Sequence, residues 1–210
     1  MFSPFTPTRR GFLLMASATP FALSACGSSW ATAYEPITEP ARDWRLASVE
    51  VIVPETLTVS EDISSYIPKA DIVWQEEPVG DRRAQVAAIF KQGITAGASG
   101  LRGKRPVRLR IVVEKFHALN KKARYSAPSG TGVYDIRYTA QVLDARSGAE
   151  LVAPQYIQAD FPGATGAAAK AAEQNGQSQR GDIVAHLTQT TAGWLGLGAD
   201  NRTSFNRAGG

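Results

Sequence analysis

Two segments in which apolar and polar residues alternate strictly constrain the fold of this chain more than any other feature. They cover residues 106–119 and 133–143, and apolar side chains occupy every second position from Val107 to Val113 and from Tyr134 to Val142. This period of two is typical of a strand that buries one face and leaves the other in water. Because the two segments follow each other in the chain, they predict an antiparallel pair of strands with one wet face.

The remaining elements are shorter. Apolar residues at three- and four-residue spacing indicate a helix over residues 81–98, with Asp81 as its N-cap. They also indicate a second helix, with Asp182 as its N-cap, that ends at Gly196 and Gly198. Short β-rich runs predict three more strands, at residues 47–59, 70–74 and 151–161. Residues 163–181 predict either the start of a helix or a mobile connection.

The resulting order, ββαβββα, predicts an α+β fold. We expect a two-layer sandwich in which two helices cover one face of a four- to five-stranded, mainly antiparallel sheet. Hydrophobic residues make up 43% and charged residues 20% of the chain, which are ordinary values for a folded domain.

The first 26 residues have the layout of an export signal. Arg9 and Arg10 stand directly before an uncharged run, residues 11–25, which contains Pro20 and ends in Leu-Ser-Ala followed by Cys26. A helix needs about 20 apolar residues to cross a bilayer, so this interrupted run is too short to be a comfortable membrane span.

The Leu-Ser-Ala-Cys sequence resembles the lipobox of bacterial lipoproteins. That resemblance implies that Cys26 is diacylated and becomes the first residue of the mature chain. Two or more acyl chains anchor a protein stably to a membrane. We therefore expect the mature chain to stay on its membrane through acylated Cys26.

The residues around the arginine pair resemble the twin-arginine export motif, with Arg9, Arg10, Phe12 and Leu13 at the matching positions. Residues 27–28 lack the aspartate that retains enterobacterial-type lipoproteins at the inner membrane. These resemblances imply a location on the periplasmic face of a bacterial membrane, the outer membrane rather than the inner.

These observations divide the chain into four parts. We expect a signal peptide at 1–25, a lipidated flexible tether at 26–46, a periplasmic α/β domain at 47–198 and a disordered tail at 199–210. Two aromatic residues in the tether, Trp30 and Tyr34, either sit at the lipid interface or pack on the surface of the domain.

The sequence predicts no enzyme, cofactor or metal site. The two histidines, His117 and His186, are expected to be surface residues or to be satisfied by local hydrogen bonds, and no metal-binding, nucleotide-binding or hydrolase motif is present. The carboxylate pair Glu76–Glu77 precedes a proline in a predicted loop. With Cys26 acylated, no thiol remains for catalysis or metal binding.

Charge is concentrated in one region. Residues 102–124 hold nine basic residues against one acidic residue, Glu114. The run ends in a compact basic cluster, Lys121, Lys122 and Arg124, in the connection between the two long strands. This cluster predicts contact with anionic lipid or with an acidic protein of an envelope complex, or it is simply a solvated tip. Nucleic acid is excluded as a partner by the expected compartment.

The signal, the tether, the element order and the turn at residues 144–150 together resemble the uncharacterised small lipoproteins of alphaproteobacteria. More distantly they are similar to auxiliary lipoproteins of ABC-type lipid transport and to the lipoprotein partner in lipopolysaccharide assembly. The resemblance implies a non-catalytic accessory or binding component of envelope lipid transport or assembly. The alternative is a structural envelope module that pairs with other proteins through its exposed sheet or edge strand.

The lipobox leads to a direct prediction. Cys26→Ser should abolish the mass increase of acylation and move the protein from the detergent phase to the aqueous phase, because the modified thiol would be gone. Intact mass spectrometry and detergent-phase partitioning measure the two effects. An unchanged mass shift in the variant would contradict the anchor assignment.

Overall fold

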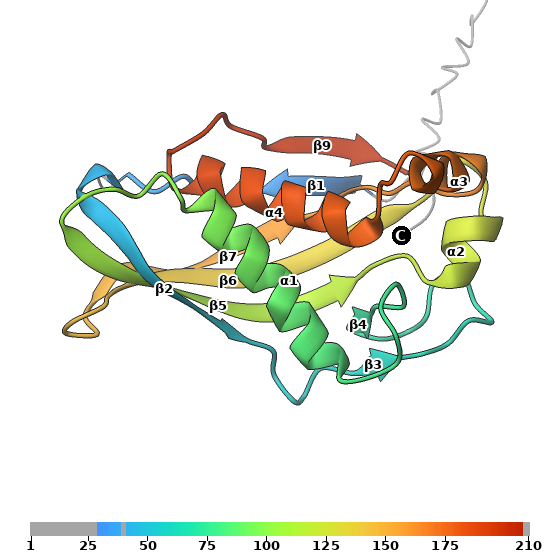
Figure 1. Cartoon of the computed structure of the whole chain (residues 1–210), viewed down its shortest axis with the longest axis horizontal. Coiled ribbons are helices and arrows are strands. Elements are labelled where there is room, and N and C mark those ends of the chain that lie inside the picture. Colours follow the sequence, from blue (N-terminus) through green and yellow to red (C-terminus); the bar gives the residue numbers. More distant parts are fainter. Residues whose placement is uncertain (1–28, 39–40, 208–210) are drawn as a thin grey trace, which may run out of the picture.

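The computed structural model describes residues 29–38 and 41–207 (Figure 1). Within these residues the chain forms one mixed sheet of nine strands and four α-helices. The predicted α+β class is therefore confirmed.

Four strands of nine residues or more, β2, β5, β6 and β7, and two helices of 16 residues, α1 and α4, form the body of the domain. In chain order the elements are β1 (Ser29–Ala33), a 3-10 helix (Ala41–Asp43), β2 (Trp44–Ile52), β3 (Val59–Ser60), β4 (Ile72–Val73), α1 (Arg82–Gly97), β5 (Arg105–His117), α2 (Lys121–Ser126), β6 (Val133–Asp144), β7 (Glu150–Ala159), β8 (Phe161–Pro162), α3 (Ala167–Gln174), α4 (Gln179–Trp194) and β9 (Thr203–Asn206). The helix predicted at 81–98 is confirmed as α1, and the Asp81 carboxylate caps it by accepting a hydrogen bond from the amide of Ala84 at 3.0 Å.

The two alternating segments become β5 and β6, and they pair antiparallel as predicted. The strand order across the sheet is β3-β4-β5-β6-β7-β1-β9, with β2 also beside β5 and β8 beside β6. The pair β5 and β6 thus lies at the centre of the sheet.

The predicted sheet of four to five mainly antiparallel strands is wrong in size and in type. The observed sheet is mixed, because β2 and β4 both run parallel to β5, and β3 runs parallel to β4. The strands that the prediction lacked are two to five residues long. Segments this short carry no readable period, and they are held by pairing with distant parts of the chain.

The predicted tether and tail are also corrected where the structure describes them. Residues 29–33 form β1 and residues 203–206 form β9, and the two strands pair with each other, with Trp30 opposite Phe205. β1 continues the sheet beside β7, where Thr32 lies opposite Ala159. Trp44, placed in the tether by the prediction, begins β2 and is buried.

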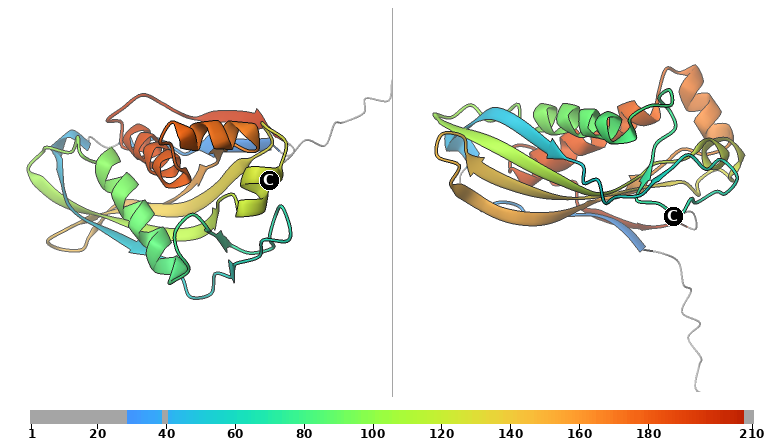
Figure 2. Two further views of the ribbon diagram at one scale, coloured as in Figure 1. Left: turned by 45° about the vertical axis from the view of Figure 1, so that its right-hand side comes forward. Right: turned by 90° about the horizontal axis from the view of Figure 1, so that it is seen from below.

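The helices α1 and α4 cover one face of the sheet, and the opposite face stays open (Figure 2). Aromatic side chains help to fill the core between the helices and the sheet, and Phe90 of α1 packs edge-on against Tyr138 of β6 at 5.2 Å between ring centroids.

The N-cap predicted for the last helix, Asp182, is wrong. The N-cap is Ser178, four residues earlier, and its hydroxyl accepts a hydrogen bond from the amide of Gly181 at 3.0 Å.

Glycines in α1 let the two long helices approach closely. A Cβ atom on Gly93 would lie 2.7 Å from the Cβ of Leu187, and one on Gly97 would lie 2.5 Å from the carbonyl oxygen of Thr188. Both contacts are shorter than atoms tolerate. The helix layer therefore depends on the absence of side chains at these two positions.

We expect Gly97→Ala to lower the free energy of unfolding by about 1–3 kcal/mol, because the new methyl group would overpack the contact with α4. Denaturant unfolding followed by tryptophan fluorescence measures the change. Gly100→Ala is the matched control, since its Cβ would come no closer than 3.4 Å to Leu197. Equal losses in the two variants would contradict the close helix contact.

Candidate ligand cavity

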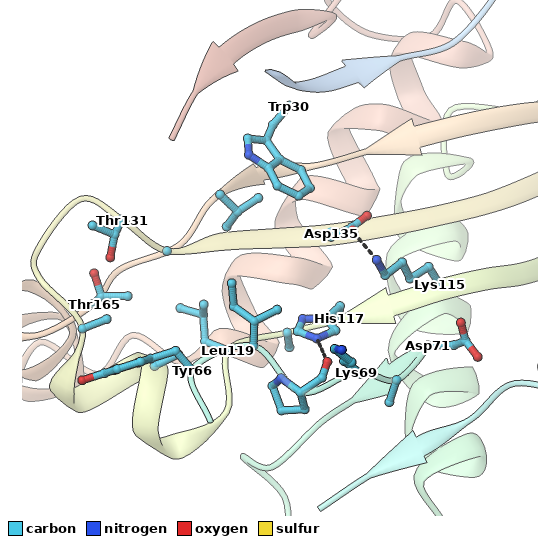
Figure 3. A pocket seen from close by; sticks show the side chains of 18 of the residues that line it. Trp30, Tyr66, Lys69, Asp71, Lys115, His117, Leu119, Thr131, Asp135 and Thr165 are labelled. Carbon is cyan, nitrogen blue, oxygen red and sulfur yellow. Dashed lines mark hydrogen bonds and ion pairs between the residues drawn. The ribbon is translucent and has the colours of Figure 1, made fainter. Parts of the chain in front are cut away.

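A cavity of about 770 Å³ lies at one end of the sheet, beside α2 (Figure 3). Its walls come from β1, from the ends of β5 and β6, and from the connections at residues 66–71 and 118–132. Ligand pockets in proteins commonly measure about 300–1,000 Å³, so this cavity has the size of a binding site for one small ligand.

A β-bulge in β5 decides which side chains reach the cavity. The register against β6 shifts between Val113 and Lys115. Before the shift, odd-numbered residues of β5 such as Val113 face the helices, whereas after it Phe116 faces them and packs near Phe90 of α1. Lys115 and His117 consequently point to the open face and line the cavity. Bulges often re-aim side chains in this way next to functional sites.

The connection between β5 and β6 forms one wall. Asn120 caps α2 by accepting a hydrogen bond from the amide of Ala123 at 2.8 Å. The same side chain donates to the carbonyl oxygens of Asp62 at 3.0 Å and Ser65 at 2.8 Å. One buried amide thus joins α2 to the loop that precedes β4.

The terminal strands close another side. Trp30 of β1 is buried and lines the cavity, and its Nε1 donates to the carbonyl oxygen of Arg207 at 3.4 Å. Arg207 in turn donates from Nη1 to the carbonyl oxygens of Gly132 at 2.9 Å and Gly163 at 3.1 Å. The sequence left open whether Trp30 sits at the lipid interface or packs on the domain, and in the structure it packs on the domain.

The lining has an apolar part and a charged part. Charged side chains from β5 and β6 gather at one end, and Thr131, Thr165 and Tyr66 lie at the other (Figure 3). The apolar contribution comes from Trp30, Ile67, Pro68, Ala70, Ala118, Leu119, Ala123, Ala127, Pro128 and Val133. A cavity of this composition suits a molecule with an apolar body and a polar head.

At the charged end, one buried carboxylate holds two cations. Asp135 accepts from Lys115 Nζ at 2.6 Å and from Arg137 Nε at 2.8 Å. The Asp135 side chain is almost fully buried, whereas about a third of each cation is exposed. Lys69 and Asp71 also line the cavity, so its lining holds three cations against two carboxylates, and the excess of one positive charge can attract an anion.

Neither histidine adds charge to the site. His117 Nε2 donates to the carbonyl oxygen of Pro68 at 2.9 Å, and burial lowers the pKa of the ring. His186 lies 3.1 Å from the Thr32 hydroxyl and stacks on Phe161, and burial lowers its pKa to about 4. Both rings are therefore neutral near pH 7, and each is satisfied by a partner that lies far away in the chain.

The basic cluster predicted as an anion contact does not form one exposed patch. Arg124 is buried, and its Nε donates to Glu173 at 2.9 Å. Lys122 donates to the carbonyl oxygen of Ser64 and lies over the ring of Tyr66, 4.9 Å from the centroid. Lys121 is exposed. The turn of α2 separates the three cations, and Arg124 is committed to the fold.

The other predicted site residues, Cys26, Arg9, Arg10, Phe12 and Leu13, lie outside the described residues. Across the part of the chain that the structure describes, no helix is long and apolar enough to span a bilayer. In that same part, no group of three or more His, Cys, Asp or Glu side chains is placed to bind a metal ion.

Sequence reasoning missed the cavity itself. Trp30, Tyr66 and Thr165 line it from three distant segments, and no motif joins them. The signal that was available is local: the apolar alternation of β5 ends at Val113 and resumes at Phe116, which indicates the bulge.

The fold and the cavity define a single α+β domain with a ligand-sized hollow on the open face of its sheet. Within that class, the chain belongs to a family of unknown function, DUF6778, whose model matches residues 44–210. No curated protein matches the sequence.

Solved structures resemble this chain only remotely. The PelC dodecamer from Paraburkholderia phytofirmans is 14% identical with a TM-score of 0.34, and the match covers 80% of this chain and 98% of that chain. A Caulobacter crescentus CB15 protein described as a "putative lipoprotein" is 15% identical with a TM-score of 0.33, over 70% of this chain and 90% of that chain. At these TM-scores the likenesses carry no argument.

The difference between buried Arg124 and exposed Lys121 in the basic cluster can be measured as a difference in stability. Arg124→Ala should lower the free energy of unfolding by about 2 kcal/mol, because it removes a charge-assisted hydrogen bond from a buried position. Lys121→Ala should change it by no more than about 0.5 kcal/mol, as is usual for an exposed side chain. Urea unfolding of both variants tests the difference, and a stable Arg124→Ala protein would contradict the structural role of Arg124.

Proposed function

We propose that this protein is a membrane-anchored periplasmic lipoprotein that acts as a non-catalytic accessory in envelope lipid transport or assembly. Its domain holds one amphiphile with an anionic head in the cavity beside α2. Acylated Cys26 keeps it on the periplasmic face of the outer membrane after export by the twin-arginine route. The lipobox and the arginine pair support the anchor and the route.

The observation that carries the proposal is the two-part lining of the cavity. The apolar walls, which include Trp30 and Leu119, suit an acyl chain. Burying apolar surface contributes about 25 cal/mol per Å² to the free energy of binding. At the other end, Lys115 and Arg137 share a single carboxylate. Their remaining N–H groups can donate to a carboxylate or phosphate head, and charge-assisted hydrogen bonds of this kind are the strong ones.

Blocking the cavity tests the proposal. Ala127 lines it, so Ala127→Phe should fill part of its volume and weaken the binding of a dansyl-labelled fatty acid about tenfold, which corresponds to 1.4 kcal/mol. Fluorescence titration of the protein carrying Cys26→Ser measures the affinity, and native mass spectrometry of the same protein detects lipid that is retained from cells. Ala153→Phe, at an exposed position of β7, is the matched control.

A second variant tests the polar head. Lys115→Met should weaken binding of the fatty acid and leave binding of the corresponding alcohol unchanged, because only the acid carries a charge for the cation to meet. Equal affinities of the Ala127→Phe variant and the control for the fatty acid would contradict the lipid-binding proposal. The structural envelope module would then be the better account.

A further inference from the structure

A loop beside the cavity exposes an unusual amount of apolar surface. Ile63 is 64% exposed, and Tyr66 and Ile67 are each 47% exposed. Tyr66 and Ile67 also line the cavity, together with Lys69. We call Ile63, Tyr66, Ile67 and Lys69 the rim loop. Clustered exposed apolar side chains of this kind mark contact with a protein or a membrane.

The rim loop is held in place by hydrogen bonds of its backbone and of its own polar residues. Asn120 binds the carbonyl oxygens of Asp62 and Ser65, as described above, and the Asp62 carboxylate accepts from the amide of Ser64 at 2.7 Å. These hydrogen bonds satisfy polar groups of the loop within the domain. Much of the apolar surface of its side chains is therefore left on the outside, in contact with solvent.

The position of Cys26 in the sequence places the anchor close to this loop. Trp30 and the rim loop line the same cavity, and β1 begins at the end of the sheet where α2 lies (Figures 1 and 3). Only four peptide units separate Cys26 from Trp30, and they span at most about 14 Å when fully extended. An acyl anchor on Cys26 therefore keeps Trp30, and the side of the cavity that Trp30 forms, within about that distance of the bilayer surface.

We propose that the rim loop lies on the bilayer that holds Cys26, so that the cavity opens directly onto the lipid headgroups. This orientation rests on the anchor in the proposed function and adds the surface through which lipid enters. The partner is a glycerophospholipid surface with anionic headgroups rather than a protein.

The chemistry of the loop fits that partner. Tyrosine rings are favoured at the level of the headgroups, where one end is apolar and the other is wet. Lys69 is exposed, and Lys122 lies over the ring of Tyr66. Each cation near an anionic surface contributes about 1 kcal/mol, which orients a domain that an acyl anchor already holds there.

The test uses the acylated mature chain in vesicles. Cys26 is the only cysteine, and acylation blocks its thiol, so a thiol-reactive nitrobenzoxadiazole label attaches only to a newly introduced cysteine. We expect the label on Ile67→Cys to shift its emission to the blue and to be quenched in vesicles that contain brominated phosphatidylglycerol. Ile63→Cys provides a second position in the same loop and should behave alike.

Ala149→Cys is the control, because this exposed residue lies in the β6–β7 turn at the opposite end of the sheet (Figure 1). Its label should keep the emission that it has without vesicles. Lys69→Ser should reduce quenching of the Ile67→Cys label in phosphatidylglycerol vesicles more than in phosphatidylcholine vesicles, since only the former are anionic.

Each result separates the proposals. Intact mass determines acylation before the vesicles are added, and a chain without lipid on Cys26 would overturn both the anchor and the orientation. With acylation established, equal quenching at residues 67 and 149, or none at residue 67, would overturn the orientation alone. Binding of the labelled fatty acid in the cavity is measured separately and does not depend on either outcome.

Discussion

The pairing of β5 with β6 is the contact on which the other layers depend. Its apolar face, with Val107, Leu109 and Ile111, is fully buried, and α1 and α4 lie over that face of the sheet. Burial of such side chains contributes about 1.5–3 kcal/mol each, so the face determines where the helices pack. The bulge at Glu114 then reverses the facing of the last residues of β5. Without it, Lys115 would point toward the helices, where a charge without a partner is costly.

The cavity follows from that reversal and from the way the sheet ends. Beyond the bulge, Lys115 and His117 lie on the open face beside Asp135 and Arg137 of β6. No long helix covers this face, and the walls are built instead from α2, from the loop before β4 and from β1 (Figures 2 and 3). Short connecting segments pack less continuously than a helix laid on a sheet. A hollow can persist between them because Asn120 and Arg207 tie those segments together through backbone carbonyl groups.

The sequence predicts the parts of this fold whose information is local. Strict alternation identifies β5 and β6, and Asp81 followed by an apolar stripe identifies α1, because both patterns depend on neighbours within a few residues. β1 and β9 escape prediction because β1 is held by β7 and β9, and β9 by β1, and these partners lie far away in the chain. The cavity escapes prediction for the same reason, because Trp30 and Tyr66 line it from segments that are distant in the chain. Cys26 and the arginine pair stay predictions, since the structure describes residues from 29 onward.

The basic run shows how a fold changes the meaning of a charge pattern. In the sequence, residues 102–124 form a strongly positive block, but the structure pairs most of it internally. The ion pairs are Arg105 with Asp144, Arg108 and Arg110 with Glu50, Lys115 with Asp135, and Arg124 with Glu173. These carboxylates come from outside the run, so the block serves first to join strands and helices.

The positive charge that these ion pairs leave over lies at both ends of the sheet. Asp135 is shared between Lys115 and Arg137, and Lys122 lies over Tyr66 of the rim loop. These cations lie at one end of the sheet, next to the apolar walls of the cavity, whereas Arg102 and Lys104 are exposed near the other end of β5. Positive charge spread over a whole domain would attract anionic surfaces in any orientation. Charge alone therefore does not select one orientation of this domain. In the proposed orientation, the exposed apolar loop and the charged head site face the bilayer that holds the proposed anchor on Cys26.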